Sequence, residues 1–152
     1  DIGKIGTPDY ILQKQSKLTG IEWEIMKEHT INGALIVSSY PIAMAKEITL
    51  SHHERWDGNG YPFKLEREMI PLSARIVTIA DVYDALRMKR SYKNELSHDE
   101  AVQYIFDNAG KHFDPLLVTH FKKIHHAFDK IWQTLKDEQA EHSLTHEVRA
   151  VV

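Results

Sequence analysis

The apolar residues of this chain recur at the spacing of helices. The segment Thr19-Gly20-Ile21-Glu22 has the pattern of a capping box, which marks the start of a helix. The residues behind it repeat three and four positions apart, which predicts one buried helical stripe of Ile21, Ile25, His29, Gly33 and Ile36. The imidazole of His29 is therefore expected to face inward. A second helix is expected to follow Pro41 and to end at the pair His52-His53.

The middle of the chain combines a long loop with another helix. Residues 54–69 hold two glycines, a proline and many charges, which favours a loop, and loops of this length in compact domains are often functional. Pro71 then opens a helix whose expected apolar stripe contains Leu72, Arg75, Ile76, Ile79, Val82, Tyr83 and Leu86. Asp81 and Asp84 are three residues apart, so they share a face of that helix.

The last third of the chain also predicts helices. Ser97-His98-Asp99-Glu100 is a second capping box, and Gly110 is expected as the C-cap of its helix. Asp114 followed by Pro115 marks a further helix that is expected to continue beyond Trp132. We find no strand alternation, internal repeat or linker. The sequence predicts an all-α fold, with one domain over residues 1–136 and a helical extension or tail over residues 137–152.

Composition excludes several classes of protein. The 152 residues include no cysteine, so disulfides, zinc fingers and thiol nucleophiles are excluded, and a metal must be bound by His, Asp or Glu. No run approaches the ~20 apolar residues of a membrane span, and no signal peptide is recognisable. A net charge of −3 without a basic stripe argues against a nucleic-acid polymer as partner but leaves a small phosphate ligand open. We expect a cytoplasmic protein.

The segment HHERWDGNGYP at residues 52–62 carries the strongest chemical signal. It places two imidazoles and two carboxylates next to glycines that let backbone approach a ligand closely. Neighbouring residues of a helix point about 100° apart. Both histidines therefore reach one centre only at the end of a helix or if they serve two metals, which indicates a binuclear site.

Three helices could contribute to such a site. His29 alone is more typical of a hydrogen-bonded core histidine than of a ligand. Asp81 is harder to explain without a metal, because a carboxylate inside an apolar stripe costs several kcal/mol unless it is paired or bound. Together with His52, His53 and Asp1 as a further carboxylate, these residues leave a metal site and a structural role both open. Two metals ~3.5–4 Å apart are the usual arrangement for phosphodiester hydrolysis.

The remaining polar residues each have two interpretations. Asp1 and Lys4 fit a solvated terminus as well as a site. The basic residues that follow the helix of Asp81 fit a solvated turn, or else phosphate binding with Arg90 as a fork and Lys93 as a point charge. The distal histidines share no spacing and have no carboxylate company, so we interpret them as surface or core residues: His112, His120, His125, His126, His142 and His146.

Taken together, these segments resemble the HD-GYP domain, a subset of the HD metal-dependent phosphohydrolases. The matching blocks are residues 1–6 (DIGKIG), 26–29 (MKEH), 52–62, 70–76 (IPLSARI), 80–86 (ADVYDAL) and 113–115 (FDP). Ordered blocks of this kind are highly specific and cover the chain to about Phe121. The resemblance implies a helical HD-domain bundle and hydrolysis of the bacterial second messenger cyclic di-GMP, either to the linear dinucleotide pGpG or on to GMP.

The resemblance also implies roles for individual residues. Two divalent ions, or three in an intact domain, would be iron or manganese, and their implied ligands are Asp1, His29, His52, His53 and Asp81. Asp1 and Lys4 are the implied catalytic residues, with Lys4 beside the scissile phosphate. Tyr61 borders the substrate and Arg90 and Lys93 hold its phosphates. Asp84 is also expected among the substrate-binding residues.

The sequence departs from the family pattern at its start. The His that precedes the Asp in the family is absent, as are the upstream helices, so we expect the C-terminal part of a catalytic domain with weak activity of its own or none. The expected partners are an upstream response-regulator or sensory domain, as in two-component systems, diguanylate cyclase (GGDEF) domains, and a second copy in a homodimer. Two alternatives remain: an HD phosphohydrolase for another nucleotide, and a non-catalytic module that binds the messenger or a signalling partner.

Overall fold

The structure, a computed structural model, describes residues 1–88 and 95–149, with side chains described as far as Lys136. It divides into two compact units, residues 1–118 and residues 119–152. Every candidate site residue falls within the first unit. Arg90 and Lys93 lie outside the described residues. No described helix is long and apolar enough to cross a membrane.

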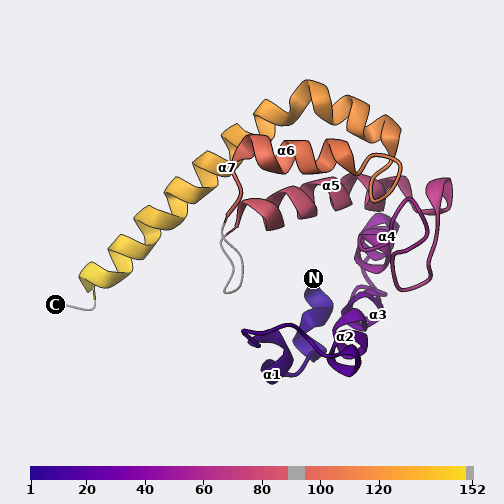
Figure 1. The fold of residues 1–152 in the computed structure, drawn as a ribbon. Helices are drawn as coiled ribbons and strands as arrows, with labels where there is room; N and C mark the ends of the chain where they lie inside the picture. Colours follow the sequence, from indigo (N-terminus) through magenta and orange to yellow (C-terminus); the bar gives the residue numbers. More distant parts are fainter. Residues whose placement is uncertain (89–94, 150–152) are drawn as a thin grey trace. The chain divides into compact units, whose positions relative to one another are not determined.

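The first unit is built from a succession of helices (Figure 1). In chain order they are η1 (Ile2–Gly6), α1 (Asp9–Leu12), α2 (Gly20–Lys27), α3 (His29–Ile36), α4 (Ala43–Ser51), η2 (Arg67–Met69), α5 (Leu72–Arg87), α6 (His98–Asp107) and the first turn of α7 (Pro115–Arg149). Neighbours in space are η1 with α3, α3 with α4, α4 with α5, and α5 with α6. The described residues form no strand, so the prediction of an all-α fold is confirmed.

The helix expected after Thr19 is in fact two helices. The capping box is present, with the Thr19 hydroxyl accepting from the Glu22 amide at 3.3 Å and the Glu22 carboxylate accepting from the Thr19 amide at 2.7 Å. α2 then ends at Lys27 and α3 begins at His29. The prediction of one continuous buried stripe was wrong, because Ile21 and Ile36 are 78% and 46% exposed.

The break between α2 and α3 has a direct consequence for His29. The last carbonyls of a helix lack partners within it. The Met26 carbonyl accepts a hydrogen bond from Nδ1 of His29 at 2.7 Å, and the Lys27 carbonyl accepts one from the Thr30 hydroxyl at 3.0 Å. His29 is 1% exposed, so the prediction that it faces inward is confirmed.

Two glycines allow η1 to lie against α3. A Cβ atom on Gly3 would overlap the His29 carbonyl oxygen and the Gly33 amide nitrogen, so the two backbones are in direct contact. Gly33 is also buried and close to the side chain of Thr49 in α4. This approach brings the residue before η1, Asp1, next to the start of α3.

α5 and α6 supply most of the apolar interior of the first unit. Ile79, Tyr83 and Leu86 of α5 are buried as predicted, whereas Leu72 and Ile76 are 54% and 51% exposed. The buried face is rotated toward small and polar residues, because Ala74 and Thr78 lie inside at the turns where Leu72 and Ile76 were expected. On α6 the buried residues are Ala101, Val102 and Ile105.

The caps of α6 and α7 follow the sequence with one correction. Ser97 and Glu100 form the expected capping box, but α6 ends at Asp107 with Asn108 as its C-cap. Gly110 instead adopts a φ of 77° in the turn that leads to α7, where its amide donates to the Phe113 carbonyl at 2.8 Å.

α7 begins at Pro115, with Asp114 directly before it as predicted. The carboxylate of Asp114 accepts from the Leu116 amide at 2.8 Å and from Arg75 of α5 at 2.7 Å. The helix extends to Arg149, which confirms that it continues beyond Trp132. The boundary expected between residues 136 and 137 stays a prediction.

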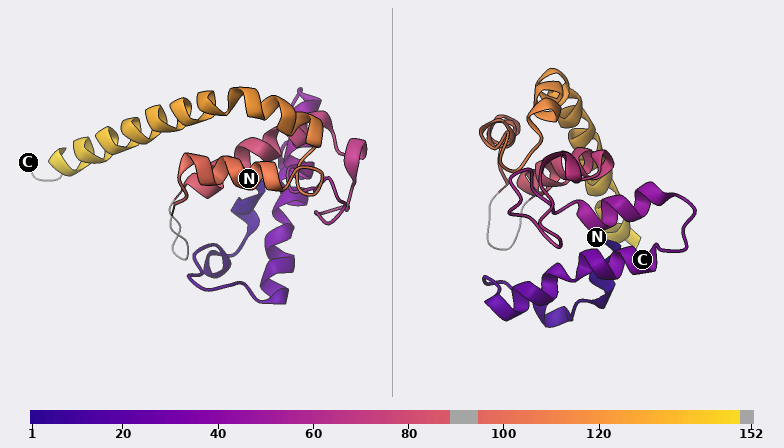
Figure 2. Two further views of the ribbon diagram at one scale, coloured as in Figure 1. Left: turned by 45° about the horizontal axis from the view of Figure 1, so that its top comes forward. Right: turned by 90° about the vertical axis from the view of Figure 1, so that its right-hand side faces the viewer.

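Between α4 and α5 the chain runs as a loop that holds one turn of 3-10 helix, η2 (Figure 2). Its first residues are His52 and His53, directly after the last turn of α4. The loop predicted for residues 54–69 is therefore confirmed apart from that single turn.

We expect Gly3→Ala to lower the free energy of unfolding by roughly 1–3 kcal/mol, the usual cost of forcing extra atoms into a packed contact. The added methyl group would push η1 away from α3. Gly6→Ala is the matched control, because its Cβ would meet only the Asn32 amide nitrogen, at 3.5 Å. Urea unfolding of both variants measures the difference, and equal effects at the two positions would contradict the proposed backbone contact.

Candidate metal centre

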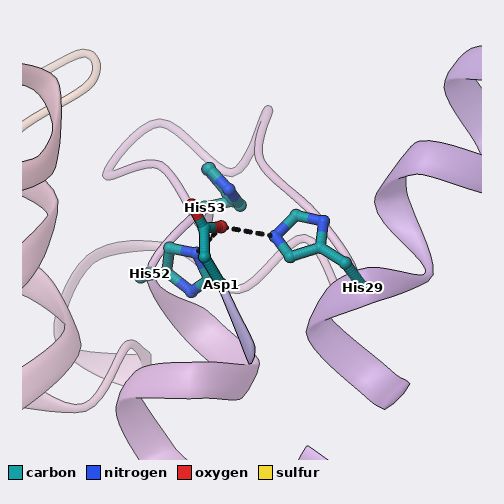
Figure 3. Close-up of side chains that lie close together, drawn as sticks. All are labelled: Asp1, His29, His52 and His53. Carbon is teal, nitrogen blue, oxygen red and sulfur yellow. Dashed lines mark ion pairs between the residues drawn. The ribbon is translucent and has the colours of Figure 1, made fainter. Parts of the chain in front are cut away.

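Three imidazoles and one carboxylate meet in the first unit. Asp1 precedes η1, His29 begins α3, and His52 and His53 follow α4. Each residue offers one ligand atom, and these atoms lie within 4.8 Å of one another. Figure 3 shows the three rings arranged around the Asp1 carboxylate. The structure thus brings four of the five predicted metal ligands together.

The rings of His29 and His52 are held in a defined tautomer. Nδ1 of His29 bonds to the Met26 carbonyl at 2.7 Å, and Nδ1 of His52 approaches the Ile48 and Thr49 carbonyls at 3.0 and 3.1 Å. A carbonyl oxygen can only accept, so Nδ1 must carry the proton. In the neutral ring, Nε2 then carries a free lone pair. This is the arrangement that metal-bound histidines usually have.

Those two Nε2 atoms are buried and have no hydrogen-bond partner among the described residues. They face Oδ1 of Asp1, at 3.4 Å from His29 and 3.7 Å from His52 (Figure 3). A lone pair on nitrogen facing a carboxylate oxygen is repulsive unless a cation lies between them. Ligand atoms ~2.0–2.2 Å from one ion lie ~3–3.5 Å from each other. The donor set and its spacing therefore fit a divalent metal.

The lowered pKa values of the three histidines favour their neutral form, which is the form that binds a cation. Burial lowers the pKa of His29 and of His52. Burial, followed by the neighbouring His52 and His29, lowers the pKa of His53 to about 2. All three imidazoles are therefore neutral at pH 7, so the contacts of His29 and His52 with Asp1 are not ion pairs. A metal would not have to displace a proton from any ring.

The adjacent pair is placed by the end of a helix. α4 ends at Ser51 and His52 is its C-cap, so the chain turns between the two rings, whose centroids are 4.1 Å apart. A position at the end of a helix is the first of the two geometries in which neighbouring histidines were expected to reach one centre. The adjacency alone therefore does not require two metals, and the number of ions stays a prediction.

Thr78 of α5 holds the backbone of His52 through a hydrogen bond. This residue was not identified from the sequence. Its hydroxyl lies 2.8 Å from the His52 carbonyl and 2.8 Å from the Ala74 carbonyl of its own helix. A threonine within an otherwise apolar buried stripe was the available signal. The contact fixes the end of α4 against α5.

Asp81 lies outside the group of four, although it acts on the site. It is half-buried, so the premise of a carboxylate fully buried in an apolar stripe was wrong. Its negative charge opposes the effect of burial on the pKa of His52 and adds to the effect of burial that raises the pKa of Tyr61. Its role as a ligand stays a prediction. Asp84, three residues later, is exposed.

Lys4 and Tyr61 each contact one of the four ligands. The Lys4 ammonium lies 2.6 Å from Oδ2 of Asp1, which leaves Oδ1 facing the histidines. The Tyr61 ring stacks on His53 with centroids 4.8 Å apart and an interplanar angle of 24°. The edge of Trp23 from α2 contacts Tyr61 at 5.8 Å. Sequence reasoning did not single out Trp23, which is 44% exposed beside the site.

Among the distal histidines, His112 is clearly a structural residue. Its ring stacks on Phe113 with centroids 4.4 Å apart, and burial lowers its pKa to about 4. It belongs to the first unit but not to the group of four.

Comparisons with known proteins agree with this geometry. The model of the HD domain family matches residues 1–117. A cyclic di-GMP phosphodiesterase of Vibrio cholerae serotype O1 is 47% identical in an alignment 146 residues long, and the match covers 90% of this chain and 30% of that protein. A 3'3'-cGAMP-specific phosphodiesterase 2 of the same organism is 45% identical in an alignment 121 residues long, and the match covers 78% of this chain and 23% of that protein. The chain thus spans about a third or less of these relatives.

One solved structure matches the fold. The crystal structure of a cyclic GMP-AMP specific phosphodiesterase of Vibrio cholerae aligns with a TM-score of 0.57 over 76% of this chain and 30% of that chain, at 24% identity. At this level of identity the likeness concerns the fold alone. It agrees with the helical architecture of the first unit.

We expect the metal-free chain to lose stability as the pH falls from about 7.5 to about 5.5. The pKa values of His29, His52 and His53 are lowered in the folded state. As the pH falls, the histidines of the unfolded chain therefore take up protons before those of the folded chain. Below the ordinary pKa of about 6.5, each histidine that stays neutral in the folded state lowers the free energy of unfolding by up to about 1.4 kcal/mol per pH unit. Urea unfolding in the presence of a chelator at several pH values measures this slope.

His112→Gln is the control for that slope, because it removes a half-buried histidine with a lowered pKa outside the group of four. This substitution should remove the part of the pH dependence that one histidine contributes and leave the larger part. Replacing His29, His52 and His53 together by Gln should remove most of the remainder. A stability that does not change between these pH values would show that the three rings accept protons in the folded state.

Proposed function

Because the chain belongs to the HD domain family, we propose that it forms the metal-binding part of a phosphodiesterase that hydrolyses cyclic di-GMP. The observation that carries the proposal is that the buried Nε2 atoms of His29 and His52 face the Asp1 carboxylate and have no hydrogen-bond partner within residues 1–88 and 95–136. This donor set is the kind that binds metals used in phosphodiester hydrolysis. The similarity to a cyclic di-GMP phosphodiesterase supports the choice of substrate.

The proposed metal ligands are Asp1, His29, His52 and His53, with Asp81 as a further carboxylate. A mixed shell of imidazole and carboxylate suits two divalent ions, and we propose iron or manganese. When bound, such ions polarise a phosphoryl oxygen and lower the pKa of water toward neutrality. The chain itself contributes rings that need not lose a proton before binding, and a carboxylate whose second oxygen is held by Lys4.

Lys4 and Tyr61 are proposed to act on the substrate. The Lys4 ammonium sits at the edge of the group and would stabilise negative charge that develops on the phosphate. Burial raises the pKa of Tyr61, so its hydroxyl remains a donor. The aromatic faces of Tyr61 and Trp23 could stack on a nucleobase, a contact worth about 1–3 kcal/mol. Asp84, Arg90 and Lys93 are proposed as further substrate contacts.

A second cyclic dinucleotide is the rival substrate. The similarity to a 3'3'-cGAMP-specific phosphodiesterase is nearly as high as that to the cyclic di-GMP enzyme. Both substrates contain guanine and the same phosphodiester bond, so the four ligands do not discriminate between them. Discrimination would have to come from residues that contact the second base.

The test is hydrolysis by the chain loaded with Mn²⁺ or, without oxygen, Fe²⁺, with products separated by chromatography. We expect cyclic di-GMP to be opened faster than 3'3'-cGAMP, and His53→Ala to reduce the rate by at least about 100-fold through loss of a ligand. His112→Gln, outside the group, should keep the wild-type rate. Preference for 3'3'-cGAMP would favour the rival substrate. Tight metal binding without any turnover would favour a non-catalytic module.

Lys4→Ala separates metal binding from chemistry. We expect its kcat to fall about 10²- to 10³-fold, the range found when one group that stabilises transition-state charge is removed, while metal content stays the same. Lys17→Ala, an exposed lysine before α2, is the matched control. Loss of metal in Lys4→Ala would instead assign Lys4 to holding the Asp1 carboxylate.

A further inference from the structure

We infer that Glu54 is a positioning residue that holds the loop of Tyr61 against His53 and so orients the His53 ring. The inference rests on the function proposed above, since His53 belongs to the proposed metal site. Glu54 follows His53 directly in the sequence, yet its side chain points away from the ligands and into the loop.

The Glu54 carboxylate connects the start of this loop to the segment just after Tyr61. It is 1% exposed, and its oxygens accept from the Phe63 amide at 2.7 Å and from the Leu65 amide at 3.1 Å. A buried carboxylate is costly unless its lone pairs are satisfied. Here both oxygens are satisfied by backbone donors from the segment just after Tyr61. That segment is thereby fixed to the residue just after His53.

The segment before Tyr61 is folded back onto the same place. The Tyr61 amide donates to the His53 carbonyl at 3.2 Å. A Cβ atom on Gly60 would overlap backbone atoms of Arg55, Glu54 and His53, so the loop lies directly on residues 53–55. Tyr61 is therefore held from both sides, by the Glu54 carboxylate after it and by this backbone contact before it.

The result is the stacking of Tyr61 on His53. His29 and His52 are each oriented by a hydrogen bond from Nδ1 to a backbone carbonyl. Within the part of the chain that the structure describes, no such bond orients His53. Its ring is instead packed against Tyr61, at 4.8 Å and 24°. Glu54 thus acts on His53 through the loop, without touching metal or substrate.

Glu54→Gln is the sharpest substitution, because it keeps the size and removes one acceptor. The carboxamide has a single acceptor oxygen, and its NH2 group would face a backbone N–H. Asp57→Asn is the matched control. Asp57 is also a loop carboxylate that accepts from a backbone amide, that of Asn59 at 3.1 Å, but its partners lie before Tyr61.

Two readouts on the full chain test the inference without any use of turnover. We expect Glu54→Gln to shift the His53 ring resonances in NMR spectra and to weaken Mn²⁺ binding about tenfold, the lower range for loss of a group that orients a ligand. Asp57→Asn should leave both at their wild-type values. A folded Glu54→Gln chain with wild-type ring resonances and Mn²⁺ affinity would overturn the inference. So would an equal loss in Asp57→Asn.

A double-mutant cycle shows whether Glu54 acts through Tyr61. Tyr61→Ala should weaken Mn²⁺ binding by a similar factor, and adding Glu54→Gln to it should change little more, since both act on one ring. Additive losses would overturn the proposed route. Should Glu54→Gln fail to fold, amide exchange in the wild-type chain decides: the Phe63 and Leu65 amides should exchange at least tenfold more slowly than in an unstructured peptide, and unprotected amides would overturn the inference.

These readouts measure metal affinity and ring position and do not depend on turnover. They therefore distinguish a failure of the positioning role of Glu54 from a failure of the proposed function. A chain that binds Mn²⁺ and responds to Glu54→Gln but hydrolyses only 3'3'-cGAMP would keep the positioning role and refute the proposed function. A chain that hydrolyses cyclic di-GMP but shows no response to Glu54→Gln would do the reverse.

Discussion

The structure of the first unit depends on the close approach of groups that repel one another. Two neutral imidazoles present their Nε2 atoms to an Asp1 oxygen at 3.4 and 3.7 Å, and neither nitrogen has a hydrogen-bond partner in the part of the chain that the structure describes. A fold that places acceptors face to face, in a site closed to water on the histidine side, is less stable than one that separates them. Such an arrangement fits a site that could hold a cation between these groups, in the way that functional sites often retain local strain.

The surrounding elements serve to hold these groups in place. Gly3 and Gly33 let η1 touch α3, which sets Asp1 beside His29. The break before α3 and the end of α4 each leave carbonyls that fix one imidazole through its Nδ1. Thr78 then ties the end of α4 to α5. His29 and His52 are thus each oriented by the termination of a helix, where backbone groups without partners are available.

Many of the helix ends and the positions of the histidines were predictable from the sequence. The features that were not predictable depend on tertiary packing. The capping boxes, the inward-facing His29 and the position of the His52-His53 pair follow from local rules, which the structure confirms. Periodicity failed where tertiary packing decides the outcome. The break at Glu28 interrupts a pattern that looked continuous, and the buried face of α5 uses Ala74 and Thr78 in place of larger residues.

In the site, too, local sequence identified some features, and the tertiary structure decided others. Residue types and spacing identified the candidate ligands, but the Nδ1 hydrogen bonds that select their tautomers depend on backbone carbonyls, which every residue has and no motif marks. Asp81 illustrates the limit most clearly. Its apolar neighbours in sequence suggested full burial, whereas the helix turns it to a half-buried position outside the group of four.

The most direct measurement is anomalous X-ray scattering from crystals of the chain grown with Mn²⁺. The account predicts a manganese peak about 2.0–2.3 Å from Nε2 of His29 and of His52 and from a carboxylate oxygen of Asp1. A peak elsewhere, or a site that holds no manganese at saturating concentration while its Nε2 atoms gain hydrogen-bond partners, would contradict it.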